Sequence, residues 1–224
     1  LSCLDRLVKG GLKDGNWLFF FDQNQNLFNN NDQFELCLGK LKSFGAASFK
    51  LTINCRNTKQ ITDANTLTTG ITNIGRPKVN GLSVRYIPYK GKADERMLLE
   101  RTLRELRDNG VCGGDLIILS RYSLANPENC LFQNPKSTTA GVIKSSGQMW
   151  RAKKTEVRFS TISAFKGLES KAVVLIDVDG FSDQTVRLLN YVAISRACSL
   201  LYILYDASKE QERQDLLVRG FFKI

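Results

Sequence analysis

Four short polar clusters follow apolar stretches of the sequence and carry the side chains best suited to chemistry. They are Asp22–Phe28, Asn54–Thr58, Thr161–Glu169 and Tyr191–Ala197. In parallel α/β sheets, ligands gather at the carboxyl ends of strands, so we expect the clusters to lie there and to form the functional site. Taken singly, each cluster also fits a plain structural role as a polar turn, a helix cap, a bend or a surface arginine.

Several kinds of site are excluded by residues that the sequence lacks. The chain has no histidine, which excludes Ser-His-Asp and Cys-His catalysis and histidine-based metal sites. Its six cysteines form no C-x-x-C pair, so we expect no metal site. The phosphate cradle G-x-x-x-x-G-K-[S/T] is also absent, because neither Gly39-Lys40 nor Gly91-Lys92 is followed by Ser or Thr. The chain alone is therefore not expected to hydrolyse a nucleotide.

Positive charge is concentrated in one stretch of the chain. The 32 Lys and Arg against 22 Asp and Glu give a net charge of +10. Residues 136–171 contain eight Lys or Arg and two Glu, and so carry +6 of that charge. Here Trp150 and Arg151 form a candidate base-stacking pair, with Lys153 and Lys154 as candidate phosphate contacts. We expect a nucleic-acid partner, and the alternative is a solvated basic loop with Trp150 in the core.

The elements that would position these clusters alternate between apolar strands and helices. The expected strands are Trp17–Phe21, Leu51–Ile53, Ser83–Tyr86, Asp115–Leu119, Val157–Ile162, Lys171–Val178 and Leu200–Tyr205. The expected helices are Leu1–Lys9, Thr58–Thr68, Glu95–Arg107, Leu188–Cys198 and Lys209–Val218. Apolar strands separated by helices predict an α/β fold with a parallel sheet covered by helices on both faces.

Two stretches interrupt this alternation. Gly70–Leu82 is expected to be a connector, and Asn126–Gly147 a long irregular excursion. Residues 1–50 are too few for an ordinary domain and are expected to end one α/β domain, whereas 51–224 form a second compact domain. No apolar run approaches the ~20 residues that span a bilayer, so we expect no membrane partner and a cytoplasmic location.

The order and spacing of the four clusters resemble superfamily 1 helicases of the UvrD/Rep type. Asp22–Phe28 is similar to motif III, a strand followed by D-x-x-Q-S-I-Y, and Leu51–Thr58 is similar to motif IV, L-x-x-N-x-R-S. Thr161–Glu169 is similar to motif V, T-x-H-x-x-K-G-L-E, and Leu189–Ala197 is similar to motif VI, L-x-Y-V-A-x-T-R-A. The motifs keep the family's order and extend from near the start of the chain to near its end. Motifs V and VI are the most specific.

The resemblance implies a motor of two RecA-like domains with ATP and Mg²⁺ in the cleft between them. Residues 1–50 would be the remnant of the first domain, and 51–224 would be the whole second domain. The phosphate cradle and the magnesium-binding acids would then lie in a missing N-terminal motor domain. The implied activity is that of an ATP-dependent DNA helicase or translocase, with this fragment alone inactive. Its partner would be single-stranded or partly duplex DNA, with RNA not excluded.

The resemblance also implies roles at the nucleotide. Gln25 would sense the γ-phosphate from the first domain. Gly167 would meet the nucleotide through its backbone, and Glu169 would meet the ribose hydroxyl. Arg56 and Arg196 would be arginine fingers, a role suited to a permanently charged group that can fork onto two phosphate oxygens. On this view, Arg196→Ala abolishes ATP hydrolysis and leaves the fold intact.

Motif V implies that Thr161, Ser163 and Lys166 contact the nucleic-acid backbone. Ser163 stands where the family often has histidine, and Ser195 where threonine is common, so both retain a hydrogen-bonding group. Asn29–Asn31 lacks the tryptophan with which many relatives stack a base. Two other functions stay open: a non-catalytic RecA-like module that binds nucleic acid through its basic stretch, and a RecA-like scaffold for protein partners.

Overall fold

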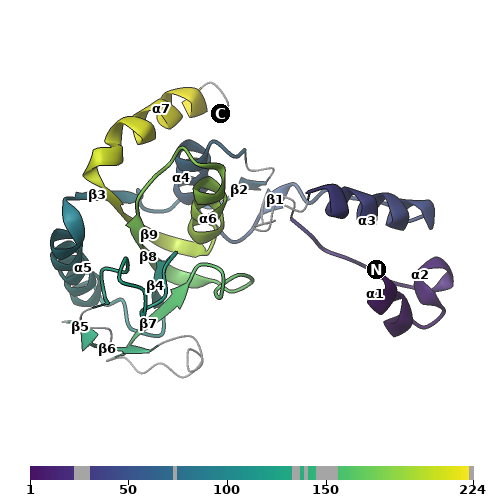
Figure 1. The fold of residues 1–224 in the computed structure, drawn as a ribbon, viewed down its shortest axis with the longest axis horizontal. Helices are drawn as coiled ribbons and strands as arrows, with labels where there is room; N and C mark the ends of the chain where they lie inside the picture. The colour runs from purple at the N-terminus through teal and green to yellow at the C-terminus, as the bar shows by residue number, and fades with distance from the viewer. Residues whose placement is uncertain (23–30, 73–74, 133–136, 139–140, 145–155, 222–224) are drawn as a thin grey trace. The chain divides into compact units, whose positions relative to one another are not determined.

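The computed structural model describes residues 1–22, 31–72, 75–132, 137–138, 141–144 and 156–221 (Figure 1). The chain divides into two compact units, Leu1–Leu51 and Thr52–Ile224. The candidate residues of the last three polar clusters all belong to the larger unit.

The smaller unit is built from helices. Its described elements are α1 (Ser2–Leu7), α2 (Gly11–Asp14) and α3 (Asn31–Ser43). Leu12 of α2 is 1% exposed. Its backbone N–H donates to Asp5 Oδ1 at 2.7 Å, and its carbonyl accepts from Trp17 Nε1 at 2.7 Å. These bonds tie α1, α2 and the following segment together.

The expected buried strand Trp17–Phe21 is wrong. The segment carries no strand assignment, and the side chains of Leu18 and Phe20 are 74% and 75% exposed. A strand requires backbone hydrogen bonds to a neighbouring strand, and the regular elements described in this unit are all helices. An apolar run alone therefore did not determine the structure of this segment.

A parallel sheet forms the centre of the larger unit, as expected from the sequence. The sheet follows the order β3 (Arg85–Tyr89), β9 (Ala197–Asp206), β8 (Ser170–Val178), β4 (Leu116–Ser120), β7 (Glu156–Thr161), β6 (Gly141–Lys144) and β5 (Ser137–Thr138). Among the described strand pairs of this sheet, only that of the edge strand β5 with β6 is antiparallel. A separate two-stranded parallel sheet joins β1 (Ile53–Asn54) to β2 (Arg76–Pro77).

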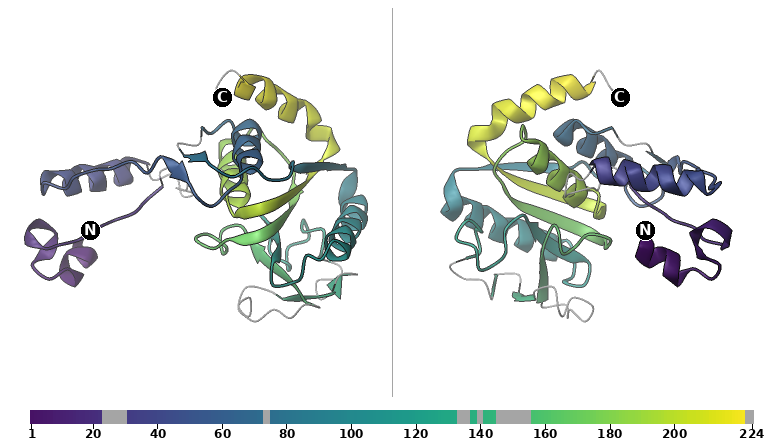
Figure 2. Two further views of the ribbon diagram at one scale, coloured as in Figure 1. Left: turned by 180° about the vertical axis from the view of Figure 1, so that it is seen from behind. Right: turned by 45° about the vertical axis from the view of Figure 1, so that its right-hand side comes forward.

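Helices cover both faces of the main sheet (Figure 2). Successive side chains of a strand point to opposite faces, so neighbours on β8 identify the two layers. Val174 belongs to the apolar core that contains Leu99 of α5, whereas Leu175 lines a small cavity together with Val186 of α6. The helices are α4 (Lys59–Thr69), α5 (Gly91–Asp108), α6 (Gln184–Ile194) and α7 (Glu210–Phe221). None of the described helices is both long enough and apolar enough to cross a bilayer.

The expectation that Asn126–Gly147 is wholly irregular is wrong. Strands β5 and β6 lie within it, and β6 extends the parallel sheet by pairing Val142 with Glu156 and Ile143 with Val157. So short an apolar run gives little periodic signal in the sequence. Its strand conformation depends on hydrogen bonds to β7. Because β7 is a separate segment of the chain, the local residue pattern of β6 does not predict this pairing.

The side chain of Glu212 fastens α7 to the turn that follows β8. It accepts hydrogen bonds from the backbone N–H groups of Phe181 and Ser182 at 3.0 and 3.2 Å, and from Ser182 Oγ at 2.8 Å. The Lys209 ammonium lies 3.0 Å from its other oxygen. The backbone N–H of Phe181, followed by Ser182 and Lys209, lowers the pKa of Glu212 to about 2 against the opposing effect of burial.

Replacing Glu212 with glutamine is therefore expected to lower the free energy of unfolding by about 2 kcal/mol at pH 7, less than the full pKa shift implies, because the side chain is 30% exposed and solvent screens it. A folded-state pKa below the unfolded value gives stability that is present above pH 4.5 and is lost as the pH falls through about 2. Urea denaturation of both proteins from pH 7 to pH 2 measures this, and the difference should vanish at the acid end. Asp215→Asn, on the same helix, is the control, because Asp215 accepts one exposed hydrogen bond from Gln211. An equal loss in both variants contradicts the assigned role.

Candidate functional site

The segment that carries Arg56 is a tight polar turn leading into α4. Asn54 Oδ1 closes the turn by accepting from the backbone N–H groups of Arg56 and Asn57, both at 3.0 Å. Thr58 then precedes the first residue of α4, which agrees with the expected helix start. Arg56 is exposed and its Nε donates to Glu169 Oε2 at 2.6 Å. The structure thus joins two sequence-predicted site residues that lie 113 positions apart.

Arg196, in contrast, is buried and is 1% exposed. Its Nη1 donates to the carbonyl of Leu168 at 3.3 Å, its Nη2 to Ser195 Oγ at 2.8 Å, and its Nε to the carbonyl of Val192 at 3.1 Å. The guanidinium therefore divides its hydrogen bonds between acceptors at the end of its own helix and one acceptor in the neighbouring loop. In this conformation, Arg196 is a structural tie as well as a candidate phosphate contact.

The two arginines are linked through adjacent residues of one loop. Arg56 binds the side chain of Glu169, and Arg196 binds the carbonyl of Leu168. The backbone N–H of Ser170, which begins β8, donates to the carbonyl of Arg196 at 3.0 Å. Three segments distant in sequence therefore meet where β8 and β9 begin.

Asn57 holds two of these segments together and was not singled out from the sequence. Its Nδ2 donates to the carbonyls of Ser195 and Ala197 at 3.2 and 2.6 Å, on either side of Arg196. Its Oδ1 accepts from Asn54 Nδ2 at 2.9 Å, so both ends of the amide are used. The sequence indicated only a possible helix-capping role, because no local signal shows which distant carbonyls an amide will meet.

Replacing Asn57 with aspartate removes both donors and places a carboxylate oxygen against two carbonyls. We expect the free energy of unfolding to fall by about 3 kcal/mol at neutral pH, since a buried charge is left facing acceptors. Urea denaturation measures the loss. Asn109→Asp is the matched control, because Asn109 Nδ2 also donates to a carbonyl, at 2.9 Å, but in an exposed position at the end of α5. Similar small losses in both variants would contradict the role of Asn57 in linking its turn to the segment around Arg196.

The expectation that all the clusters stand at strand carboxyl ends is wrong for this part of the site. Glu169 directly precedes β8, and Arg196 directly precedes β9, so both lie at the amino edge of the sheet. The segment 162–169 runs from the end of β7 back to the start of β8. Within it, Gly167 is exposed and has φ +89°, a backbone conformation that favours glycine. Because this loop crosses from the carboxyl edge to the amino edge of the sheet, Gly167 and Glu169 lie away from the carboxyl edge.

The proposed nucleic-acid residues Thr161, Ser163 and Lys166 begin at that carboxyl edge. Thr161 ends β7, paired with Ser120 of β4, and its Oγ1 accepts from the backbone N–H of Ala164 at 3.3 Å. Ser163 and Lys166 are exposed, whereas Phe165 between them is 1% exposed and anchors the turn. The candidate contacts are therefore held by a buried aromatic side chain. They begin at the end of the sheet opposite to Glu169.

The remaining sequence candidates lie outside the described residues. These are Gln25 of the first unit and, in the basic stretch, Trp150, Arg151, Lys153 and Lys154. Their assignments stay predictions from the sequence.

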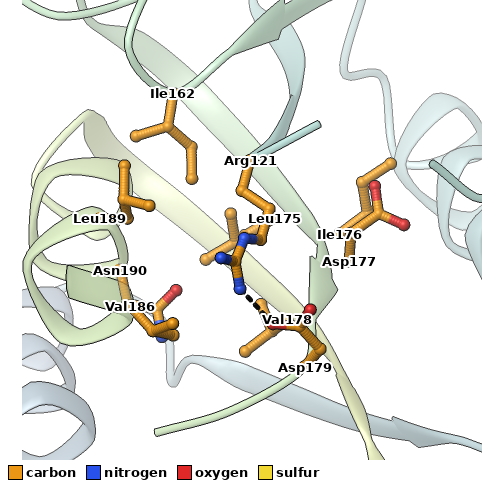
Figure 3. Close-up of a pocket in the computed structure, with 10 residues that line it drawn as sticks. All are labelled: Arg121, Ile162, Leu175, Ile176, Asp177, Val178, Asp179, Val186, Leu189 and Asn190. Carbon is orange, nitrogen blue, oxygen red and sulfur yellow. Dashed lines mark hydrogen bonds and ion pairs between the residues drawn. The ribbon is translucent and has the colours of Figure 1, made fainter. Parts of the chain in front are cut away.

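A small cavity lies between β8 and α6 near the carboxyl edge (Figure 3). Arg121 reaches Asp179 with an Nη1–Oδ1 distance of 2.5 Å, and the hydroxyl of Tyr122 donates to Asp179 Oδ2 at 2.7 Å. The cavity has a volume of about 10 Å³, which suffices for at most one water molecule. It cannot hold a nucleotide or another cofactor.

Comparison with known proteins finds a similar fold in a solved structure. No family model matches the chain, and no curated protein matches it. Among solved structures, the chain is similar to the C-terminal domain of a possible DNA helicase from Lactobacillus plantarum WCFS1. The match has a TM-score of 0.55 at 19% sequence identity and covers 75% of this chain and 94% of that chain. The chain therefore has a mixed α/β, RecA-like fold similar to that domain, with a parallel sheet flanked by helices.

Proposed function

We propose that this chain is the second motor domain of an ATP-dependent DNA helicase or translocase of superfamily 1, related to UvrD and Rep. The observation that carries the proposal is the convergence of Arg56, Glu169 and Arg196 at one edge of a RecA-like sheet. The fold is similar to that of the C-terminal domain of a possible DNA helicase. The three residues belong to the segments that resemble motifs IV, V and VI.

ATP and Mg²⁺ would be held mainly by the missing N-terminal motor domain, because this sequence has no phosphate cradle. ATP supplies the phosphoanhydride bond whose hydrolysis drives the motor. The exposed Arg56 fits a phosphate contact, since its guanidinium has further donors beside the one that Glu169 accepts. Domain closure would press Arg56 against the phosphates. There it would stabilise the charge that develops during phosphoryl transfer.

Arg196 is the second proposed arginine finger. Its donors now bind Leu168, Ser195 and Val192, so contact with a phosphate requires that some of these bonds open. Its bond to the carbonyl of Leu168 restrains the backbone beside Glu169, which would meet the ribose hydroxyl. Opening and closing of the cleft would thus move the loop 162–169, which follows Thr161.

Nucleic acid would bind through Thr161, Ser163 and Lys166, together with the basic stretch. The net charge of +10 favours a polyanionic partner. The same charge favours a second candidate function, a non-catalytic RecA-like module that binds single-stranded nucleic acid without regard to ATP.

The decisive experiment measures ATP hydrolysis by a protein that carries both motor domains, with and without single-stranded DNA. We expect hydrolysis that DNA stimulates and no hydrolysis by the present chain alone. Binding of DNA by the longer protein without any stimulated hydrolysis favours the non-catalytic module and overturns the motor. Parallel measurements with RNA of the same sequence identify the preferred nucleic acid.

Lys166→Ala tests the nucleic-acid contact separately. If Lys166 neutralises one phosphate, the slope of log K against log salt concentration should become shallower by about 0.7 for single-stranded DNA. Fluorescence anisotropy with a labelled oligonucleotide at several salt concentrations measures this slope. Lys59→Ala, an exposed lysine at the start of α4, is the control and should leave the slope unchanged. Equal slopes for all three proteins contradict a phosphate contact at Lys166.

A further inference from the structure

Three buried side chains from different elements meet beside α5, away from the site described above. They are Glu95 of α5, Cys130 of the turn after β4, and Asp177 of β8. Each offers one ligand atom, and these atoms all lie within 4.8 Å of one another. Glu95 is 0% exposed, Asp177 1% and Cys130 7%. The proposed motor function uses none of the three.

The backbone and neighbouring groups hold Asp177 in this cluster. Its φ of 58° lies in the left-handed region, which residues other than glycine seldom adopt and which often marks a functional position. Its backbone N–H donates to Glu95 Oε1 at 2.6 Å. Its carboxylate accepts from the Cys130 backbone N–H at 3.0 Å and from Ser120 Oγ at 2.5 Å. These hydrogen bonds hold the carboxylates of Asp177 and Glu95 close to each other and in fixed orientations.

The cluster has too little positive charge for its buried acids. Glu95 Oε2 accepts no hydrogen bond from the described residues, and the Lys92 ammonium lies 3.5 Å away, beyond the usual hydrogen-bond length. The same ammonium lies 3.1 Å from Asp177 Oδ1, so one cation serves two carboxylates. A buried carboxylate oxygen that accepts no hydrogen bond from the described part of the chain, beside an ammonium shared with a second carboxylate, points to a cation site.

We propose that Cys130 Sγ, Glu95 Oε2 and an Asp177 oxygen bind a divalent cation of the zinc class where the Lys92 ammonium now lies. A thiolate combined with carboxylates suits Zn²⁺, and three protein ligands leave one position for water. Cys130 loses its thiol proton to solvent on binding, as does Glu95 where it is protonated. The two carboxylates and the thiolate then balance the ion and Lys92. Lys92 is 38% exposed on a flexible stem and can turn outward to make room.

The test uses the present chain with Cys130 as its sole thiol and Cd²⁺ as the probe. The other cysteines, replaced by serine, are Cys3, Cys37, Cys55, Cys112 and Cys198. A cadmium–thiolate bond absorbs in the ultraviolet, so the band reports Cys130 alone. We expect a saturable band with one Cd²⁺ per chain, removed by competition with Zn²⁺ and accompanied by proton release.

Two variants and one control decide the assignment. Lys92→Met removes the competing ammonium and should tighten Cd²⁺ binding about tenfold or more, whereas Glu95→Gln should weaken it by a similar factor. Lys90→Met, at an exposed neighbouring lysine, should change nothing. Circular dichroism without metal checks that each variant is folded. If Glu95→Gln does not fold, Lys92→Met still tests the proposal, because it keeps all three ligands. Absence of the band, or equal affinity in the Lys92→Met and Lys90→Met chains, overturns the proposal. The outcome does not depend on the motor function.

Discussion

Replacing Arg56 with alanine in the protein that carries both motor domains is expected to lower the rate of DNA-stimulated ATP hydrolysis about 10³-fold. The expected loss is large because Arg56 would stabilise charge only in the transition state, so kcat falls more than KM changes. Steady-state measurement of phosphate release over a range of ATP concentrations separates the two constants.

The same substitution should barely alter the stability of the chain. The bond between Arg56 and Glu169 joins side chains that are 39% and 56% exposed, and such surface pairs contribute at most about 1 kcal/mol. Arg85→Ala is the matched control, because Arg85 also lies in an exposed pair, 3.5 Å from Glu105, but on β3. Full activity in the Arg56 variant, or an equal loss in the Arg85 variant, contradicts the finger assignment.

Replacing Arg196 with alanine is expected to lower the free energy of unfolding by about 4 kcal/mol. The substitution removes the hydrogen bonds of the guanidinium to Val192, Ser195 and Leu168, and it leaves the carbonyls of Leu168 and Val192 without that donor. It also leaves a cavity, since Arg196 is among the largest fully buried side chains of the described residues. The structure therefore replaces the expectation, drawn from the sequence, that this variant keeps its fold intact.

Urea denaturation of the present chain measures this loss without any reference to ATP. Arg104→Ala, at an exposed position of α5, is the control and should change stability by less than about 0.5 kcal/mol. A loss for Arg196→Ala no greater than that of the control contradicts the structural tie. Because loss of stability and loss of chemistry coincide at Arg196, Arg56 is the cleaner test of the proposed mechanism.

Most regular elements of the larger unit could be predicted from the sequence, because their hydrophobic patterns are long and local. The strand expected at Lys171–Val178 is β8, and the helix expected at Glu95–Arg107 lies within α5, which begins four residues earlier. The strand prediction for Trp17–Phe21 was wrong because a strand forms only where a neighbouring strand pairs with it. Strand β6 was missed for the same reason. Periodicity describes one segment and carries no information about its partner.

The amino-acid sequence by itself determined the alternation of strands and helices and the four polar clusters, since both depend on residues close together in the chain. Only the tertiary structure decided which distant groups meet: Arg56 with Glu169, Asn57 with the carbonyls beside Arg196, and Glu95 with Asp177. It also decided that one arginine is exposed and the other buried. Burial and long-range hydrogen bonds arise from the packing of whole layers, and the identity of a single residue does not specify them.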